Sequence, residues 1–572
     1  MIKELSEMPT QSENSTNSKM QRSDWIQLGI IVIGAILFRF IFMTNFSAIG
    51  FDEVNYLKLA AAGRINGLNH VLHTYWSPFY PLVVALFSYI IPNFEFAGRW
   101  LSTLCASLVI IPIFFFVKTN VNKKVAFITS LFIAFFPFTA YFSARAETEF
   151  VYSLVAIGGI LIGWSVLKNR QISKAAIAGV LFGFAYLTRP EGAGFLITFW
   201  GIIAVVIISQ LINKQKVLPY IAILILSGLG FGIVSAPYLI FLRQETGEWT
   251  ISTKGSSNQQ GEMYVKNRDQ FKEHPFHSLS KDNKRLLQDE VYHLGTFLKT
   301  VQKQGKPVVK ISIKDFIQKV GENYYKVITE ALTRVLTVPL LLLLGLGLFG
   351  TAWTREKALL NLYLLSFFIF FWFIVIPIFH INLRYFIPLL PLSFMWIAIG
   401  ANNFLEWFSK TLENMTNKFS DKIPIKIVGS IFLILFVLVG SILPELGKRM
   451  KKYNGSTVEW APCIEQKKAG LWLKEHGVKS PVIMAYNHAV GFYAGNYNIQ
   501  QSVEIPENKI DRLLEYAKFR GVKYLVLNDR YKQRHPLIAH LYEQKAVPPE
   551  LKLIYFDKME NGLKTLIYEI LE

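Results

Sequence analysis

The chain has 572 residues, of which 52% are hydrophobic, and its formal net charge is +20. A mean hydropathy of +0.33, with long uninterrupted runs of Ile, Leu and Phe, excludes an ordinary soluble protein and indicates a polytopic membrane protein. In such a protein an excess of Lys and Arg is typical of cytoplasmic loops, so the charge predicts contact with membrane lipid or a lipid phosphate and no nucleic-acid partner.

The N-terminus is polar before the first apolar run begins. Residues 1–24 are rich in Ser, Asn and Gln and are predicted to form a disordered cytoplasmic segment. The run from Trp25 to Phe46 is too long for a signal peptide and lacks a small-residue cleavage site, which predicts a retained first span. The two cysteines, Cys105 and Cys463, do not predict a disulfide.

Eleven apolar segments are predicted to span the membrane as helices. With the N-terminus in the cytoplasm, every predicted cytoplasmic loop carries at least two Lys or Arg residues, as the positive-inside rule expects. The predicted spans are 25–46, 98–117, 125–143, 150–167, 174–188, 192–210, 218–241, 335–352, 358–379, 385–402 and 427–443.

A further apolar run, 78–91, is only about 14 residues long and is bounded by prolines. Counted as a span, it would invert every later segment and place the basic loops outside. It is therefore predicted to be a re-entrant or interfacial helix.

Two domains follow from this topology. Residues 25–452 form the transmembrane domain, with outer loops at 47–97 and 243–334. The end of the second loop, Phe316 to Leu336, has apolar residues at helical spacing and predicts an amphipathic helix on the membrane surface. Residues 453–572 alternate helical patterns with short β-type runs, which predicts an extracytoplasmic α/β domain. The expected helices and strands there are 464–476, 509–520, 482–485, 524–527, 551–556 and 565–568.

Four groups of charged and polar residues fall at one membrane face under this topology. Each has an ordinary alternative, because an acid suits a helix N-terminus and an arginine can reach the interface from a helix end. Their convergence on one edge of an apolar bundle is what indicates a site. The groups are Asp52 and Glu53; Arg145, Glu147 and Glu149; Arg189 and Glu191; and His380, Asn382, Arg384 and Tyr385.

The chemistry of these groups suits a particular kind of substrate. Such a substrate has an apolar tail in the bilayer, a phosphate at the interface and a reacting group just outside. Arginine binds phosphate through several donors and stays charged. A carboxylate can deprotonate an attacking hydroxyl or stabilise positive charge at the anomeric carbon of a sugar. These properties favour a glycosyltransferase that uses a polyprenyl-phosphate-linked sugar.

The chain resembles the GT-C glycosyltransferases, which include the protein O-mannosyltransferases and the aminoarabinose transferases of lipid A. The resemblance rests on the pair Asp52-Glu53 after the first span and on three later motifs, Trp76–Pro81, Leu187–Gly192 and Arg384–Pro391. It covers nearly the whole membrane part. It implies a polytopic α-helical fold of about eleven spans, and bacterial members carry a similar extracytoplasmic C-terminal domain.

The resemblance also implies roles for the acidic residues. Asp52 is the implied catalytic carboxylate that activates the acceptor, with Glu53 beside it. Glu149 matches the acidic position of the second outer loop, where the family often has proline next and this chain has Phe150. Glu147, two residues away, is a competing candidate.

The remaining candidates are implied to bind substrate. Arg189 and Arg384 resemble ligands of the donor phosphate, Tyr385 is placed to orient them, and Arg145 and His380 complete the candidate set. Some GT-C enzymes use a divalent ion and others need none. Asp52, Glu149 and His380 would suit a divalent ion, but no spacing shows that they converge, so no obligatory metal or other cofactor is predicted.

The expected function is therefore transfer of a sugar from a polyprenyl-phosphate-linked donor to a protein, lipid or glycan acceptor, at the extracytoplasmic face of the cell membrane. The alternative is a multi-span transporter or lipid flippase. Transporters usually place charges and broken helices near the bilayer midplane and have repeated halves, whereas here the charges fall at one face and no repeat is found.

Overall fold

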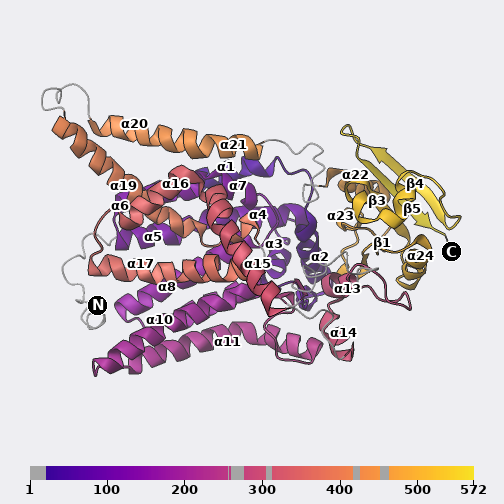
Figure 1. Ribbon diagram of the computed structural model, residues 1–572, viewed down its shortest axis with the longest axis horizontal. Coiled ribbons are helices and arrows are strands. Elements are labelled where there is room, and N and C mark those ends of the chain that lie inside the picture. Colours follow the sequence, from indigo (N-terminus) through magenta and orange to yellow (C-terminus); the bar gives the residue numbers. More distant parts are fainter. Residues whose placement is uncertain are drawn as a thin grey trace.

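The computed structural model describes residues 21–255, 257–258, 276–304, 312–379, 381–415, 425–450 and 463–571. Long helices run side by side through most of the molecule, and a small domain with a β-sheet caps one end (Figure 1). That end is called the site end below.

The bundle helices coincide with the predicted spans. Each of the eleven predicted spans overlaps one helix or a run of two or three consecutive helical segments. In the described residues, eight helices are long and apolar enough to cross a membrane, or nine if the pair bent by 52° at Pro137 is one span. The helices are α1 (Arg22–Met43), α4 (Phe94–Leu108), α5 (Ile110–Asn120), α6 (Lys123–Phe135), α7 (Pro137–Ser143), α8 (Glu149–Asn169), α9 (Lys174–Thr188), α10 (Ala193–Ile212), α11 (Leu218–Thr246), α16 (Leu332–Phe349), α17 (Arg355–Phe368), α18 (Ile376–Ile378), α19 (Leu390–Met415), α20 (Ile425–Val437) and α21 (Leu443–Met450).

Two predicted spans lie on helices that are too short or not apolar enough to be counted among these eight or nine. Helix α9 has only 15 residues, and α19 carries the polar pair Asn402 and Asn403 among its apolar residues. Glycine lets α19 approach its neighbour α16 closely. A Cβ on Gly347 would lie 1.8 Å from the Trp396 carbonyl oxygen, and one on Gly400 would lie 1.8 Å from that of Leu343. Small residues at helix contacts are typical of membrane bundles.

The predicted amphipathic helix is present but is not a separate element. Helix α15 (Ile313–Lys326) continues through the π-helical turn η5 (Val327–Ala331) directly into α16. The combined helix runs from Ile313 to Phe349 and changes direction at Thr337, whose φ is +57°. The predicted start of the span, residue 335, lies two residues from this break, so the boundary between the amphipathic and apolar parts agrees with the prediction.

Two short helices lie at the site end of the bundle. Helix α2 (Phe51–Asn66) begins with acids in its first turn, and the 3₁₀ turn η1 (Leu68–Val71) leads to α3 (Phe79–Phe87). Nine residues of helix rise only about 14 Å, so α3 cannot cross a bilayer, as expected for the 78–91 run.

The C-terminal domain is α/β, as predicted. Its five-stranded sheet has the order β2-β1-β3-β5-β4, with β1 parallel to β2 and β3, and β5 antiparallel to β3 and β4. The strands are β1 (Ile483–Met484), β2 (Ser502–Val503), β3 (Tyr524–Asn528), β4 (Leu551–Lys558) and β5 (Lys564–Ile570), and the helices are α22 (Ile464–Glu475), α23 (Ala489–Tyr493), α24 (Ile510–Phe519) and α25 (Ala539–Tyr542). The sequence analysis missed the two-residue strand β2 and two short helices, α23 and α25.

The C-terminal domain rests directly on the N-terminal half of the bundle. The buried Lys58 ammonium of α2 donates to Ser502 Oγ at 2.7 Å. The backbone N–H of Ile49 donates to the Tyr493 hydroxyl at 3.1 Å, and that hydroxyl donates to Glu95 Oε2 at 2.9 Å. Helix α2, which carries the predicted catalytic acids, is therefore held between the bundle and the domain (Figure 1).

Candidate active site

Four separate segments bring the predicted acids and arginines together at the site end. Asp52 and Glu53 lie in the first turn of α2, where acids complement the helix dipole. Arg145 and Glu147 lie between α7 and α8, and Glu149 is the first residue of α8. Arg189 directly follows α9. Arg384 and Tyr385 lie in the 3₁₀ turn η7 (Leu383–Phe386), where the Asn382 side chain accepts a hydrogen bond from the Arg384 N–H.

Arg384 is the centre of this cluster. Its Nη2 donates to Oδ2 of Asp52, and its Nη1 lies 2.8 Å from Oε1 of Glu147. Its Nε lies 3.6 Å from Oε1 of Glu149. One guanidinium thus connects three carboxylates from two segments that are far apart in the sequence, a geometry that the several donors of arginine permit.

Glu53 has a different environment from its neighbour Asp52. Its carboxylate is buried, and it accepts hydrogen bonds from the backbone N–H of Gly50 and, at 2.7 Å, of Ala146. Oε2 also lies 3.4 Å from Nη2 of Arg145. Glu53 therefore ties the start of α2 to the loop that carries Arg145 and Glu147, while Asp52 faces Arg384.

Arg189 forms the second cationic side of the cluster. Its Nη1 lies 3.2 Å from Glu149 Oε1, and its Nη2 lies 3.5 Å from Glu191 Oε1. The Tyr385 ring lies against both arginines, with its centroid 4.8 Å from the guanidinium carbon of Arg189 and 5.4 Å from that of Arg384. Cation–π contacts of this kind fix the planes of the guanidinium groups.

Lys254 belongs to this site and was missed by the sequence analysis. Its ammonium lies 5.4 Å from the ring centroid of Tyr75 and 5.5 Å from that of Trp76, and it pairs with no carboxylate of the described residues. Its charge acts on Asp52, Glu191 and both arginines. In the sequence Lys254 is one of many lysines in a long polar loop, and nothing in the local pattern distinguishes it from the others.

The balance of burial and charge sets the ionisation of the acids. Burial alone would raise the pKa of Asp52, but the positive charges of Arg384 and Lys254 outweigh it and hold that pKa below its usual value. Burial raises the pKa of Glu147 to about 7, although Arg145 and Arg384 act in the opposite direction. At neutral pH Asp52 is therefore the ionised acid, and Glu147 is close to its midpoint.

The structure brings together the predicted site residues that it describes. Asp52, Glu147 and Glu149 meet at Arg384, and the other members, Glu53, Arg145, Arg189 and Tyr385, surround them. The remaining candidate, His380, lies outside the described residues. The structure therefore does not test whether Asp52, Glu149 and His380 could bind one ion. Asp52 and Glu149 both contact Arg384.

Comparisons with known proteins agree with the predicted resemblance. Residues 75–239 match the family model of the dolichyl-phosphate-mannose-protein mannosyltransferases. No curated protein matches the sequence. The structure resembles that of ArnT from Cupriavidus metallidurans bound to undecaprenyl phosphate, with 13% identity, a TM-score of 0.50, and coverage of 96% of this chain and 98% of that one.

A second solved structure matches most of this chain and a smaller share of its own. The Archaeoglobus fulgidus oligosaccharyltransferase in its apo form matches with 13% identity and a TM-score of 0.49, over 95% of this chain and 74% of that chain. The family-model match over residues 75–239 and the fold shared with ArnT agree with the GT-C resemblance and with the predicted fold class. Neither comparison supports a transporter.

Proposed function

We propose that the charged cluster around Arg384 transfers a sugar from a polyprenyl-phosphate-linked donor to an acceptor at the membrane face that carries the C-terminal domain. The observation that supports this most is the set of contacts from one guanidinium to Asp52, Glu147 and Glu149 at the end of an apolar bundle. The lipid chain of the donor would lie along the bundle, and its phosphate would reach the cations at the site end.

Asp52 acts on the acceptor in this proposal. It is ionised at neutral pH and is partly accessible, with 27% of its side chain exposed. As the acceptor oxygen bonds to the anomeric carbon, the bond from that carbon to the donor phosphate breaks, and Asp52 accepts the proton of the acceptor hydroxyl. The bond electrons leave with the polyprenyl phosphate.

The cations stabilise the phosphate as its negative charge grows. Nε of Arg189 and Nε of Arg384 are buried without a hydrogen bond, so both arginines keep a donor to offer. The Lys254 ammonium lies over the faces of Tyr75 and Trp76 and pairs with no carboxylate of the described residues, so its donors are available to a phosphate. These three groups are the proposed phosphate ligands, and Tyr385 orients the two arginines.

The other acids are positioning groups in this proposal. Glu53 holds α2 against the loop before α8, so it fixes where Asp52 points without touching substrate. Glu147 and Arg145 pair with each other at 2.9 Å and hold one side of Arg384. Oε1 of Glu149 lies 3.2 Å from Arg189 and 3.6 Å from Arg384, so this acid links two of the three proposed phosphate ligands.

The domain limits and the orientation are also proposals. Residues 1–24 are the cytoplasmic N-terminus, 25–452 the catalytic membrane domain with outer loops 47–97 and 243–334, and 453–572 the extracytoplasmic domain. A membrane-impermeant maleimide added to intact cells tests this, because the native Cys105 and Cys463 are both buried. Lys518→Cys in the C-terminal domain is expected to be labelled, and Lys410→Cys near the end of α19 is expected to stay unlabelled. The reverse pattern would mean that the C-terminal domain lies in the cytoplasm.

A transfer assay tests the function itself. Purified protein in detergent receives a panel of radiolabelled undecaprenyl-phosphate-linked hexoses and pentoses, with a membrane extract as the source of protein, lipid and glycan acceptors. Movement of label from one donor into one acceptor fraction is expected. If no donor loses label, while the same protein in liposomes moves the intact lipid between leaflets, the flippase alternative replaces the transferase.

A further inference from the structure

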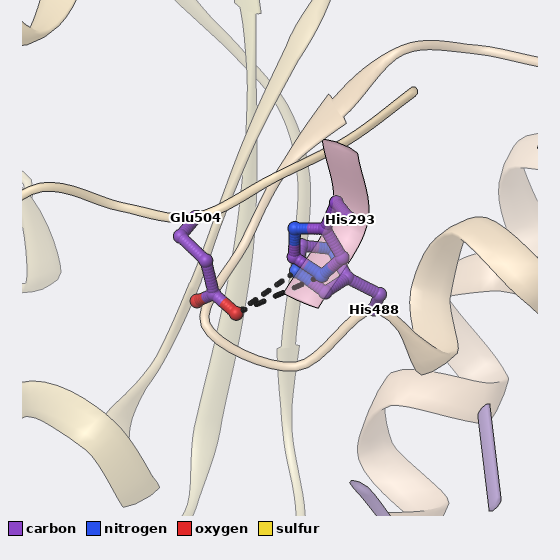
Figure 2. A group of neighbouring side chains, drawn as sticks. All are labelled: His293, His488 and Glu504. Atoms are coloured by element: carbon purple, nitrogen blue, oxygen red, sulfur yellow. Dashed lines mark ion pairs between the residues drawn. The ribbon is translucent and has the colours of Figure 1, made fainter. Parts of the chain in front are cut away.

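Three buried side chains face one another where the second outer loop meets the C-terminal domain. His293 lies in the π-helical turn η4 (Glu290–Leu294), His488 directly precedes α23, and Glu504 follows β2. Figure 2 shows both imidazole rings directed at the same oxygen of Glu504. Nε2 of His488 lies 3.3 Å from Oε1 of Glu504, and Nε2 of His293 lies 4.0 Å from that oxygen.

The atoms that face each other lack ordinary partners. Both Nε2 atoms and both carboxylate oxygens of Glu504 are buried without a hydrogen bond of normal geometry. The Lys58 ammonium lies in the same region but donates to Ser502 and does not pair with Glu504. The Gln288 side chain also interacts with Glu504, but no Lys or Arg of the described residues pairs with it. A buried carboxylate without a cation is costly, and an unseen ion is one explanation for such a group in a native protein.

Asp289 determines which nitrogen of His293 faces the cluster. Nδ1 of His293 donates to Asp289 Oδ1 at 3.0 Å, so Nε2 carries a lone pair directed toward Glu504. Asp289 is itself fixed by the Tyr516 hydroxyl at 2.6 Å and by Arg520 Nη1 at 2.9 Å, and it accepts the backbone N–H of Glu504 at 2.9 Å. A carboxylate behind an imidazole is typical of histidines that bind metals.

We propose that His293, His488 and Glu504 bind one divalent transition-metal ion, and that zinc is the ion they suit best. Two imidazole nitrogens and one carboxylate oxygen are a common zinc ligand set, with bonds of about 2.0–2.2 Å. Such bonds at tetrahedral angles place ligand atoms roughly 3.4 Å apart, and the three ligand atoms here lie within 4.8 Å of one another. Imidazole ligands disfavour calcium and magnesium, which prefer oxygen.

The ion would join the C-terminal domain to a loop beside the active site. The segment around His293 holds residues 73–76 through its backbone carbonyls. The Tyr292 oxygen accepts from Trp76 Nε1 at 2.8 Å, and the Gly295 oxygen accepts from Thr74 Oγ1 at 3.0 Å. Residues 73–76 include Tyr75, whose ring lies against Lys254. Because all three ligands are buried, the ion has a structural role and does not contact substrate.

The metal content of the full-length protein tests the site. Tag-free protein purified in detergent is incubated with zinc chloride, dialysed against zinc-free buffer and analysed by inductively coupled plasma mass spectrometry. Wild type is expected to retain close to one zinc per chain. Glu504→Gln and His488→Gln are each expected to retain at least ten-fold less under the same conditions, because loss of one of three ligands removes most of the affinity.

A matched control separates ligand loss from general disruption. His535→Gln changes another buried histidine of the same domain, one that contacts the Tyr542 hydroxyl at 3.1 Å, and is expected to retain zinc like wild type. Each variant is compared only as a monodisperse peak. Wild-type protein with no more zinc than Glu504→Gln would overturn the proposal. Zinc is counted without a transfer assay, so failure of the proposed transfer reaction would leave this result unaffected.

Discussion

Two buried clusters of ionisable side chains at the same end of the molecule are neutralised in different ways. Around Arg384, the cations Arg145, Arg189 and Lys254 face a comparable number of carboxylates, so most charges have an opposite charge beside them. Around Glu504, the facing groups are two histidines, and no Lys or Arg of the described residues pairs with the carboxylate.

The difference indicates what each cluster needs. The Arg384 cluster is nearly neutral without a ligand, and an incoming phosphate can exchange for a carboxylate at small electrostatic cost. The Glu504 cluster has lone pairs directed at a common point and lacks a positive charge there, so a bound cation completes it. The first cluster suits a substrate that enters and leaves, and the second suits an ion that stays.

Removal of the central cation is expected to give the largest effect on stability. Arg384→Gln leaves Asp52, Glu147 and Glu149 with one cation fewer. Removing one partner of a buried ion pair costs about 3–5 kcal/mol of folding free energy. The cost is smaller here because the side chains of Arg384 and Asp52 are partly exposed. The midpoint of thermal unfolding in detergent should fall by about 5 °C or more.

The double variant Arg384→Gln/Glu147→Gln sharpens this prediction. It removes one charge of each sign, so it should recover part of the lost stability. The exposed pair of Arg334 and Glu330 provides the control, and Arg334→Gln should change the midpoint by less than about 1 °C. A double variant that unfolds as early as Arg384→Gln alone would mean that charge balance does not hold this cluster together.

Removal of the proposed metal is expected to have a smaller effect. An ion present at about 100 times its dissociation constant adds about 2.7 kcal/mol of stability, which a chelator removes. EDTA should therefore lower the unfolding midpoint of wild type and of Asp52→Asn by a similar few degrees and leave Glu504→Gln unchanged. Equal sensitivity of Glu504→Gln would place the stabilising ion elsewhere.

The smallest predicted effect concerns Lys254. Lys254→Gln removes one of three proposed phosphate ligands on a loop, so the KM for the lipid-linked donor should rise about three- to ten-fold, with kcat changed less. Lys299 offers a matched control, because it lies on the same outer loop but pairs with Glu245 at the surface. A fall in kcat with unchanged KM would place Lys254 in the chemical step.

The sequence predicted the bundle well because long apolar runs leave few choices for a backbone in lipid. It also predicted that Asp52, Glu149, Arg189 and Arg384 would lie close together, because each lies near the end of a predicted span, and the structure brings them together. The sequence analysis treated Asp52 and Glu53 as a catalytic pair. In the structure Glu53 accepts a hydrogen bond from the Ala146 N–H, whereas Asp52 faces Arg384, and no local sequence pattern reveals this long-range contact.

The residues that the sequence missed come from long-range contacts. Lys254 becomes part of the site only because its loop folds back over Tyr75 and Trp76. His293, His488 and Glu504 lie far apart in the chain and lack the close spacing of a familiar metal motif, so only their convergence in the folded chain identifies them.

The most direct test of the account is the rate of sugar transfer by wild type and Asp52→Asn, measured side by side with the donor identified in the panel. Asparagine keeps the volume of Asp52 but cannot accept the proton, so transfer should fall by roughly 10²–10⁴-fold while the unfolding midpoint and zinc content stay near wild type. The exposed Asp511→Asn should transfer at the wild-type rate. Wild-type turnover by Asp52→Asn would contradict the assignment of this cluster as the active site.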